Sequence, residues 1–238
     1  MQHPQPHPPR QQQQGQPQGQ QPPLSARPLY IFGGGGHADE TLWSIRGWVA
    51  SGAPFAPQAF VVPDPSREET RKRALPLISE QEFQQTEGSI ALALGIGNPA
   101  VARQIFAHYP PSERYSWPSI VHPSVIGDQR EVELGVGVHI FPGCVLTTNI
   151  QLGNLVTLNR GVNLSHDCQV GDFALLNPGA QISGGVQIGE GALVGVNATV
   201  LQYKSIGAGA QMGAGAVLTQ DLPPGETWVG VPAAPLQK

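Results

Sequence analysis

The chain has 238 residues and a formal net charge of −4, with 13 Lys and Arg against 17 Asp and Glu. Its one basic cluster is the short stretch 67–73, so the charge distribution argues against nucleic acid as the principal partner. No apolar run reaches the length of a membrane span, and the N-terminus lacks the basic start and apolar core of a secretory signal.

Residues 1–27 form a Gln- and Pro-rich tail with ten Gln and seven Pro. Such a composition buries too little apolar surface to offset the entropy lost on ordering, which predicts disorder. A Pro-rich ligand for a partner domain is the alternative reading.

Residues 28–121 alternate predicted strands with predicted helices, and each strand ends in glycine or a turn. This order predicts a small α/β, Rossmann-like domain that binds substrate. Ligands of such sheets bind at the carboxyl ends of the strands, where 33–37, Asp64 and 95–98 should converge. The predicted strands are Leu29–Phe32, Ala59–Val62 and Ile90–Leu94, and the predicted helices are His37–Val49 and Pro99–His108.

The glycine turn after the first strand matches the dinucleotide fingerprint G-x-G-x-x-G/A at Gly33, Gly35 and Ala38. The unit is too short for the two halves that a dinucleotide needs, which favours a nucleotide or nucleotide sugar held by backbone N–H groups at the helix start. Gly33, Gly35, Gly36 and His37 are therefore candidate substrate-binding residues. Glycine packing without a ligand is the alternative.

Residues 122–222 are organised in hexads. From Leu134 to Leu218 an aliphatic residue or Met returns at every sixth position, and a smaller buried-type residue follows four positions later, with Lys204 the only polar exception. This period fits a chain that wraps around a prism, each hexad giving one short strand and one corner. A Gly-rich β-sandwich would instead show period-2 strands and irregular turns.

A longer period, three hexads in length, sets the size of a coil. Gly follows the aliphatic residue at Gly135, Gly153, Gly171, Gly189 and Gly207, so three hexads form one triangular coil and five coils are expected. A recurrent corner glycine is expected where the backbone needs positive φ or has no room for a side chain. At Lys204 we expect a distorted corner and a side chain that reaches solvent. Residues 223–238 form a C-terminal extension.

The two cysteines, Cys144 and Cys168, occupy small interior positions of their hexads, on different faces of adjacent coils. Interior packing is the expected role, and nothing indicates a disulfide framework or an oxidising compartment. We therefore expect a cytoplasmic protein.

One corner of the predicted prism carries the residues Ser165, His166 and Asp167. A histidine with a carboxylate beside it suits general-base catalysis, although an ordinary surface His–Asp pair is the alternative. Asn159 lies on the preceding corner, and Gly184 follows His166 by three hexads, which places it one coil above. A base next to a backbone N–H that can stabilise an oxyanion predicts acyl transfer.

Four segments together resemble a family: GGGGHA in the α/β unit, VHPSVIG in the linker, LNRGVNLSHDCQVGD in the hexads and WVGVPAAPL near the end. They are similar to bacterial sugar acyltransferases of the PglD and NeuD type, and the resemblance covers about residues 29–236. It implies a left-handed parallel β-helix, acetyl-CoA as co-substrate, no metal, and a homotrimer in which CoA lies between two solenoids and each active site is shared.

The resemblance also implies roles for individual residues. His166 corresponds to the catalytic base, Asp167 to the carboxylate that positions it, and Asn159 to an active-site amide. Gly184 corresponds to the glycine whose N–H contacts the thioester carbonyl, and His37 to the head-domain histidine near the acceptor.

Two positions depart from the family pattern. Asp64 is similar to the acidic residue that holds the nucleotide base, but Pro63 and Pro65 flank it. Leu175 stands where many relatives carry His, so any polar contribution from that position is absent.

Several functions fit this pattern. The first is N-acetylation of a nucleotide-linked amino sugar, and the second is O-acetylation of a sialic acid or another sugar hydroxyl. A zinc hydratase would need His122, His139 and His166 on one corner, and their spacing along the chain does not stack them there. A solenoid that binds a nucleotide sugar without turnover is the remaining alternative, and the Thr array of a flat-faced scaffold is absent from the sequence.

Overall fold

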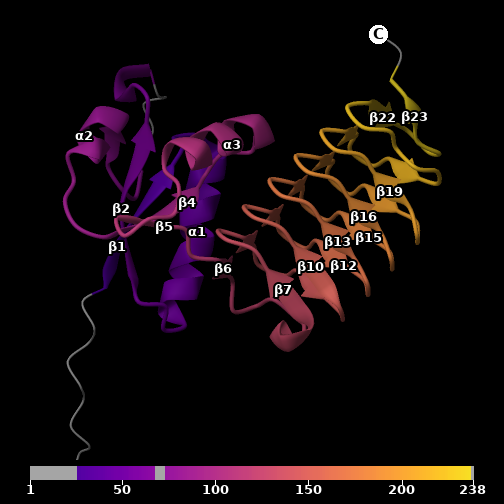
Figure 1. Ribbon diagram of the computed structural model, residues 1–238, viewed down its shortest axis with the longest axis horizontal. Helices are drawn as coiled ribbons and strands as arrows, with labels where there is room; N and C mark the ends of the chain where they lie inside the picture. The colour runs from indigo at the N-terminus through magenta and orange to yellow at the C-terminus, as the bar shows by residue number, and fades with distance from the viewer. Residues whose placement is uncertain (1–25, 68–72, 237–238) are drawn as a thin grey trace, which may run out of the picture.

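The structure is a computed structural model that describes residues 26–67 and 73–236. It consists of an α/β head and a prism of stacked coils, which lie side by side in Figure 1. The predicted tail at 1–27 lies almost entirely outside the described residues.

The head is built on a five-stranded parallel sheet in the order β3-β2-β1-β4-β5. Helix α1 packs on the sheet face that carries Leu29 and Ile31, whereas α2 and α3 cover the opposite face around Phe32. The predicted α/β unit is therefore confirmed. Its elements are β1 (Arg27–Phe32), α1 (Gly36–Ala50), β2 (Phe55–Val62), a 3-10 turn (Pro65–Arg67), β3 (Leu77–Ser79), α2 (Glu80–Gln84), β4 (Ile90–Leu94), α3 (Pro99–His108) and β5 (Tyr115–Ser116).

Two helices of the head begin at well-formed caps. In α2 the Ser79 side chain and Glu82 form a reciprocal capping box, and in α3 the Asn98 side chain accepts from the N–H groups of Ala100 and Val101. Helix α1 differs, because its N-cap is Gly35, which offers no side-chain acceptor. The N–H of Ala38 bonds back to the Gly35 carbonyl at 3.0 Å, and within the described residues the N–H groups of Gly36 and His37 are left for another acceptor.

The second unit is a parallel β-helix with three sheets, in which strands pair with the strand one coil further along the chain, as Gln151 pairs with Gln169 and Asn163 with Gln181; the final pair, β22 with β23, is antiparallel. Two of the sheets have five strands each, which confirms five coils. One sheet contains β7 (Val132–Leu134), β10 (Ile150–Leu152), β13 (Gln169–Val170), β16 (Gln187–Ile188) and β19 (Ser205–Ile206). The next contains β9 (Val145–Leu146), β12 (Asn163–Leu164), β15 (Gln181–Ile182), β18 (Thr199–Val200) and β21 (Val217–Leu218). The third contains β6 (Ile120–Val121), β8 (His139–Ile140), β11 (Thr157–Leu158), β14 (Leu175–Leu176), β17 (Leu193–Val194), β20 (Gln211–Met212), β22 (Thr227–Val229) and β23 (Ala234–Pro235).

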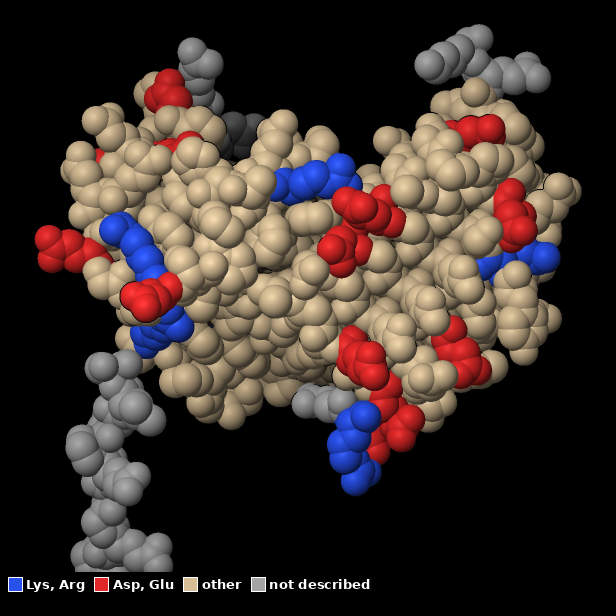
Figure 2. All heavy atoms as spheres, viewed as in Figure 1, with Lys and Arg blue, Asp and Glu red and all other residues tan. Residues whose placement is uncertain are grey.

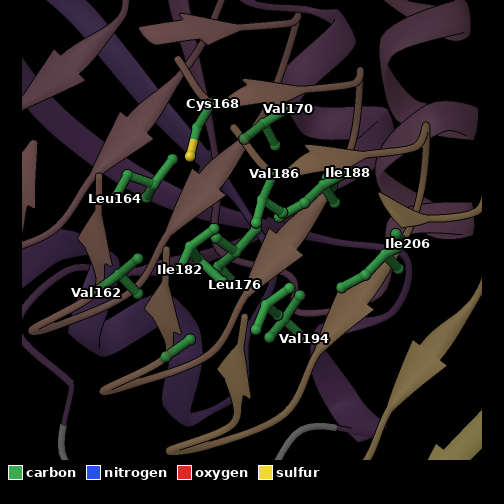
Figure 3. Close-up of a cluster of buried hydrophobic side chains, with 14 of the residues drawn as sticks. Val162, Leu164, Cys168, Val170, Leu176, Ile182, Val186, Ile188, Val194 and Ile206 are labelled. Atoms are coloured by element: carbon green, nitrogen blue, oxygen red, sulfur yellow. The ribbon is translucent and has the colours of Figure 1, made fainter. Parts of the chain in front are cut away.

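The hexad residues line the interior of the prism, and Figure 3 shows part of this buried cluster, Cys168 included. Leu134 is an exception, with 40% of its surface exposed, because β7 is the edge strand of its sheet and no coil lies beneath it. Lys204 is half-buried, and its carbonyl still accepts the N–H of Gln187. The side chain thus reaches solvent as expected, but the expected distortion is wrong at this corner, because the backbone ladder continues through it.

Glycine recurs at these corners because a side chain there would clash with the backbone of the next coil. A Cβ on Gly135 would lie 2.6 Å from the carbonyl carbon of Gly153, and one on Gly189 would lie 2.5 Å from the nitrogen of Ala208. The left-handed conformation that turns each corner belongs to residues two positions later, such as Leu155. Of the two predicted reasons, close packing of coils is therefore the one that applies.

The head packs on one sheet and one corner of the prism. Strand β6 pairs with β8, while Leu155 and Phe173 from the prism corners enter the aromatic core of the head. His139 of β8 lies buried under α1, where its Nε2 is 3.0 Å from Ser44 Oγ. Acidic and basic side chains are scattered over the face seen in Figure 2, with wide uncharged areas between them. In the described parts of the chain, no helix is long and apolar enough to cross a bilayer.

Candidate active site

His166 lies on the corner between β12 and β13, where about half of its side chain is exposed. Its Nδ1 lies 2.8 Å from Asp167 Oδ2. An ionised carboxylate only accepts hydrogen bonds, so the proton belongs on Nδ1 and the lone pair of Nε2 is available as a base. The hydrogen bond from His166, with a second one from Asn149, holds the pKa of Asp167 below its usual value.

Gly184 lies one coil above His166, directly against the imidazole ring. A Cβ on this glycine would come within 2.5 Å of His166 Nε2. The next amide, that of Gly185, donates to the His166 carbonyl at 2.8 Å, whereas the Gly184 N–H has no protein acceptor within the described residues. The predicted pair of a base and a backbone donor therefore lies together at one corner.

A third residue of this corner, Asn149, escaped the sequence reasoning. Its Nδ2 donates to Asp167 Oδ1 at 2.6 Å. It precedes Asp167 by three hexads, which places it one coil below, so the coil period could have identified it.

A second group of predicted residues lies in a cleft between the head and the prism. His37, in the first turn of α1, stacks on the buried ring of Phe141 with a centroid distance of 5.6 Å. Burial lowers the pKa of His37, and the neighbouring Glu40 acts in the opposite direction. The cleft is lined by His37, Glu40, Gly97, Asn159, Arg160, Leu175, Asn177, Pro178 and Leu193.

Glu40 and Arg160 join the two sides of this cleft and were also missed from the sequence. Arg160 Nη1 lies 2.6 Å from Glu40 Oε1, and the other carboxylate oxygen of Glu40 is 3.7 Å from His37 Nδ1. Glu40 lies one helical turn after His37, the spacing of neighbours on one helix face, which was the available signal.

Asn159 belongs to this cleft and not to the His166 corner. It is almost fully buried, and its Oδ1 accepts the N–H of Arg160 at 2.8 Å. Asn159 and His166 stand at corners at opposite ends of β12, so within one chain the two predicted catalytic residues lie at different corners, and only Asn159 lines the cleft.

The glycine turn of the head borders a third hollow, a cavity of about 470 Å³ at the carboxyl ends of β1 and β2. Gly33 has φ of 122°, and a Cβ there would lie 2.6 Å from the Gly95 carbonyl oxygen, so the segments that follow β1 and β4 converge as predicted. The cavity is lined by Phe32, Gly33, Gly34, Val61, Val62, Pro63, Glu80, Ile96, Val101, Gln104, Ile105 and His108.

The remaining candidates in the head flank this cavity. Gly35 caps α1 and Gly36 is its first residue. The half-buried Asp64 follows β2, and its Oδ1 accepts from the N–H of Ser66 at 3.0 Å and from its hydroxyl at 2.7 Å. Glu80 lines the cavity but was missed, because the short strand β3 before it is too brief to recognise from sequence.

The side chains of this chain do not gather a metal site in the described residues, where no group of three or more His, Cys, Asp or Glu lies close together. Both cysteines are buried and unpaired, and burial raises the pKa of Cys144 to about 11.

Solved structures of similar proteins extend over nearly the whole described chain. The acetyltransferase domain of PglB from Neisseria gonorrhoeae is 27% identical with a TM-score of 0.79, and the match covers 88% of this chain and all of that one. Perosamine N-acetyltransferase from Caulobacter crescentus is 31% identical with a TM-score of 0.77, covering 88% and 97%. WeeI from Acinetobacter baumannii is 28% identical with a TM-score of 0.76, covering 87% and 99%. No family model matches the sequence, and no curated protein matches it.

A Rossmann-like head joined to a prism of hexad coils, with a His–Asp pair at one corner, defines a class of acyltransferase. Because the chain is 31% identical to the perosamine enzyme over nearly the whole of that enzyme, it belongs to the sugar N-acetyltransferases that are built from hexapeptide repeats as a left-handed β-helix.

Proposed function

We propose that this protein transfers the acetyl group of acetyl-CoA to an amino group of a nucleotide-linked sugar. The observation that carries the proposal is the contact between His166 and Gly184, which sets a base beside a backbone N–H that is free to donate. Related structures support the two substrates: the PglB domain has been solved with acetyl coenzyme A, and the perosamine enzyme with CoA and GDP-perosamine.

In the proposed reaction, the amine nitrogen attacks the carbonyl carbon of the thioester while Nε2 of His166 takes the proton that the amine loses. A carbon–nitrogen bond forms, and the carbon–sulfur bond then breaks. The CoA thiolate leaves with the proton that His166 returns. Asp167, bonded to Nδ1, orients the imidazole and stabilises its positive charge.

Gly184 supplies the second requirement of acyl transfer. Its N–H stabilises the negative charge that develops on the carbonyl oxygen during attack. Donors of this kind contribute about 3 kcal/mol in other enzymes, and a backbone donor is already fixed before the substrate binds.

The cavity in the head suits the nucleotide. A volume of about 470 Å³ is in the usual range for a small-molecule site. The uncapped start of α1 at Gly35 and Gly36 offers backbone N–H groups and the positive end of the helix dipole to a phosphate. Asp64 follows the neighbouring strand β2, at the same edge of the sheet as this cavity.

We further infer that the active site is completed by a second copy of the chain in a homotrimer. His37 and Asn159 lie at the opposite end of β12 from His166, so a neighbouring prism can bring one chain's His37 cleft to the other chain's His166 corner.

The test is the release of CoA thiol from acetyl-CoA by the purified protein with a panel of nucleotide-linked amino sugars, sialic acids and other sugars. We expect release with an amino sugar, loss of that release in His166→Ala, and a product acetylated on nitrogen by mass spectrometry. Release with hydroxyl acceptors only would replace N-acetylation by O-acetylation, and no release with any acceptor would contradict the proposal.

A further inference from the structure

Asn149, Asp167 and His166 form a continuous hydrogen-bonded line across two coils. Asn149 Nδ2 is 2.6 Å from one carboxylate oxygen of Asp167, and His166 Nδ1 is 2.8 Å from the other. We infer that Asn149 is a positioning residue, which fixes the Asp167 carboxylate and thereby the protonation pattern of the His166 ring. This inference rests on the proposed role of His166 as the base.

The chemistry of the line allows one arrangement of protons. The carboxylate between the two partners accepts from both sides, so Asn149 must present its NH₂ group and His166 must carry its proton on Nδ1. With the proton there, Nε2 keeps its lone pair on the side where Gly184 lies. A carboxylate held at both oxygens cannot rotate away from the ring.

The side chain of Asn149 is needed for something other than turning the corner. Asn149 and Asp167 both have left-handed backbone conformations, with φ of 52° and 61°. The equivalent residues on another edge of the prism are mostly glycine, Gly143, Gly161 and Gly179, which turn the chain without any side chain. At the edge with His166, the asparagine amide instead meets the carboxylate of the next coil.

Within the described residues, Asn149 makes no hydrogen bond to Gly184 and does not line the cleft that holds His37. Any effect of this residue on the reaction therefore passes through Asp167, and it should change turnover more than substrate binding.

The experiment compares the full chain with Asn149→Asp, Asn149→Gly and the control Asn197→Gly. The aspartate has the same shape and also tolerates φ above zero, but it replaces the donor by an acceptor. Asn197 has φ of 53° on a different edge of the prism, so its glycine variant reports the effect of glycine at such a corner. Nitrogen-15 NMR of the His166 ring measures the tautomer, and steady-state kinetics measure kcat and KM.

We expect the ring of the unmodified protein to carry its proton on Nδ1. In both Asn149 variants the Nε2–H tautomer should gain population and kcat should fall about tenfold or more, with KM for acetyl-CoA within about twofold. Asn197→Gly should match the unmodified protein in both readouts. An Asn149→Asp protein with unchanged tautomer and kcat would overturn the inference. If the unmodified protein transfers no acetyl group, the proposed function has failed, and the NMR comparison still decides the role of Asn149.

Discussion

The imidazole of His166 occupies the space where a side chain on Gly184 would begin, with Nε2 2.5 Å from the position of that absent Cβ. Three hexads separate the two residues, so the coil period brings a base and a backbone donor to one point.

Replacing His166 by Ala should lower kcat by about 10² or more, because the proton of the attacking amine loses its acceptor. The side chain is half-exposed and lies outside the hydrophobic core, so the unfolding midpoint should stay nearly the same. Thiol release and thermal unfolding measure the two effects. Near-normal turnover in this variant would rule out His166 as the base.

Gly184→Ala should displace the ring of His166 from its place over the backbone N–H. We expect kcat to fall about tenfold or more, since small displacements of reacting groups are costly, while the ring can swing outward at little cost in stability. The same substitution in a His166→Ala background should change the residual rate by less than about twofold. Equal effects in both backgrounds would mean that Gly184 acts independently of the ring.

Two inactive variants should complement each other if the site is shared between copies. Chains carrying His166→Ala and chains carrying His37→Ala, co-expressed in equal amounts, should regain about a quarter of the normal activity, because both intact residues then meet by chance at that frequency. A mixture of His166→Ala with His166→Asn serves as the control and should stay inactive. Absence of recovery would place both residues of one site on one chain.

Stability should fall in acid because of His139. Burial, with smaller contributions from His37 and His122, lowers the pKa of His139 from 6.5 to about 3. Below pH 6.5 the unfolded chain binds a proton that the folded chain does not, so the free energy of unfolding decreases as the pH falls toward 3, by at most about 1.4 kcal/mol per pH unit.

His139→Phe is the matched variant for this effect. It retains a ring to stack on Phe141, 4.0 Å away in the present protein, and removes the titrating group. Denaturant unfolding at pH 7 and pH 5 should show a smaller loss for the variant than for the unmodified protein. An equal loss in both would assign the acid sensitivity to other groups.

The prism was predictable from sequence because its repeat is local and long. An aliphatic residue or Met occupies every sixth position from Ile140 to Leu218, and only a prism with six residues per side buries all of them. In the structure all of these residues are buried in the interior. The structure differs from the sequence prediction at two positions. Leu134 is exposed because no coil lies beneath its strand, and the corner at Lys204 is regular because its carbonyl still accepts the N–H of Gln187 on the neighbouring coil. In the head, the short elements β3, α2 and β5 have too few residues to show a period.

In the candidate site, only contacts between residues that are separated by one coil period could be predicted from the sequence. That period relates His166 to Gly184 on the coil above, and it relates Asp167 to Asn149 on the coil below. The contacts of Glu40 with Arg160 depend on how the head docks on the prism, and no spacing in the sequence encodes this.

Because Asn149, His166 and Gly184 come from three successive coils, the chain between them tolerates no change of length smaller than a whole turn of the prism. An insertion of a single amino acid would put every later residue one position out of its place in the hexad and separate the base from its donor. Whole coils could be added or lost beyond Leu218 without disturbing that alignment. In related chains, variation in length should therefore concentrate in the head loops and at the far end of the prism, and comparison of their lengths would reveal this directly.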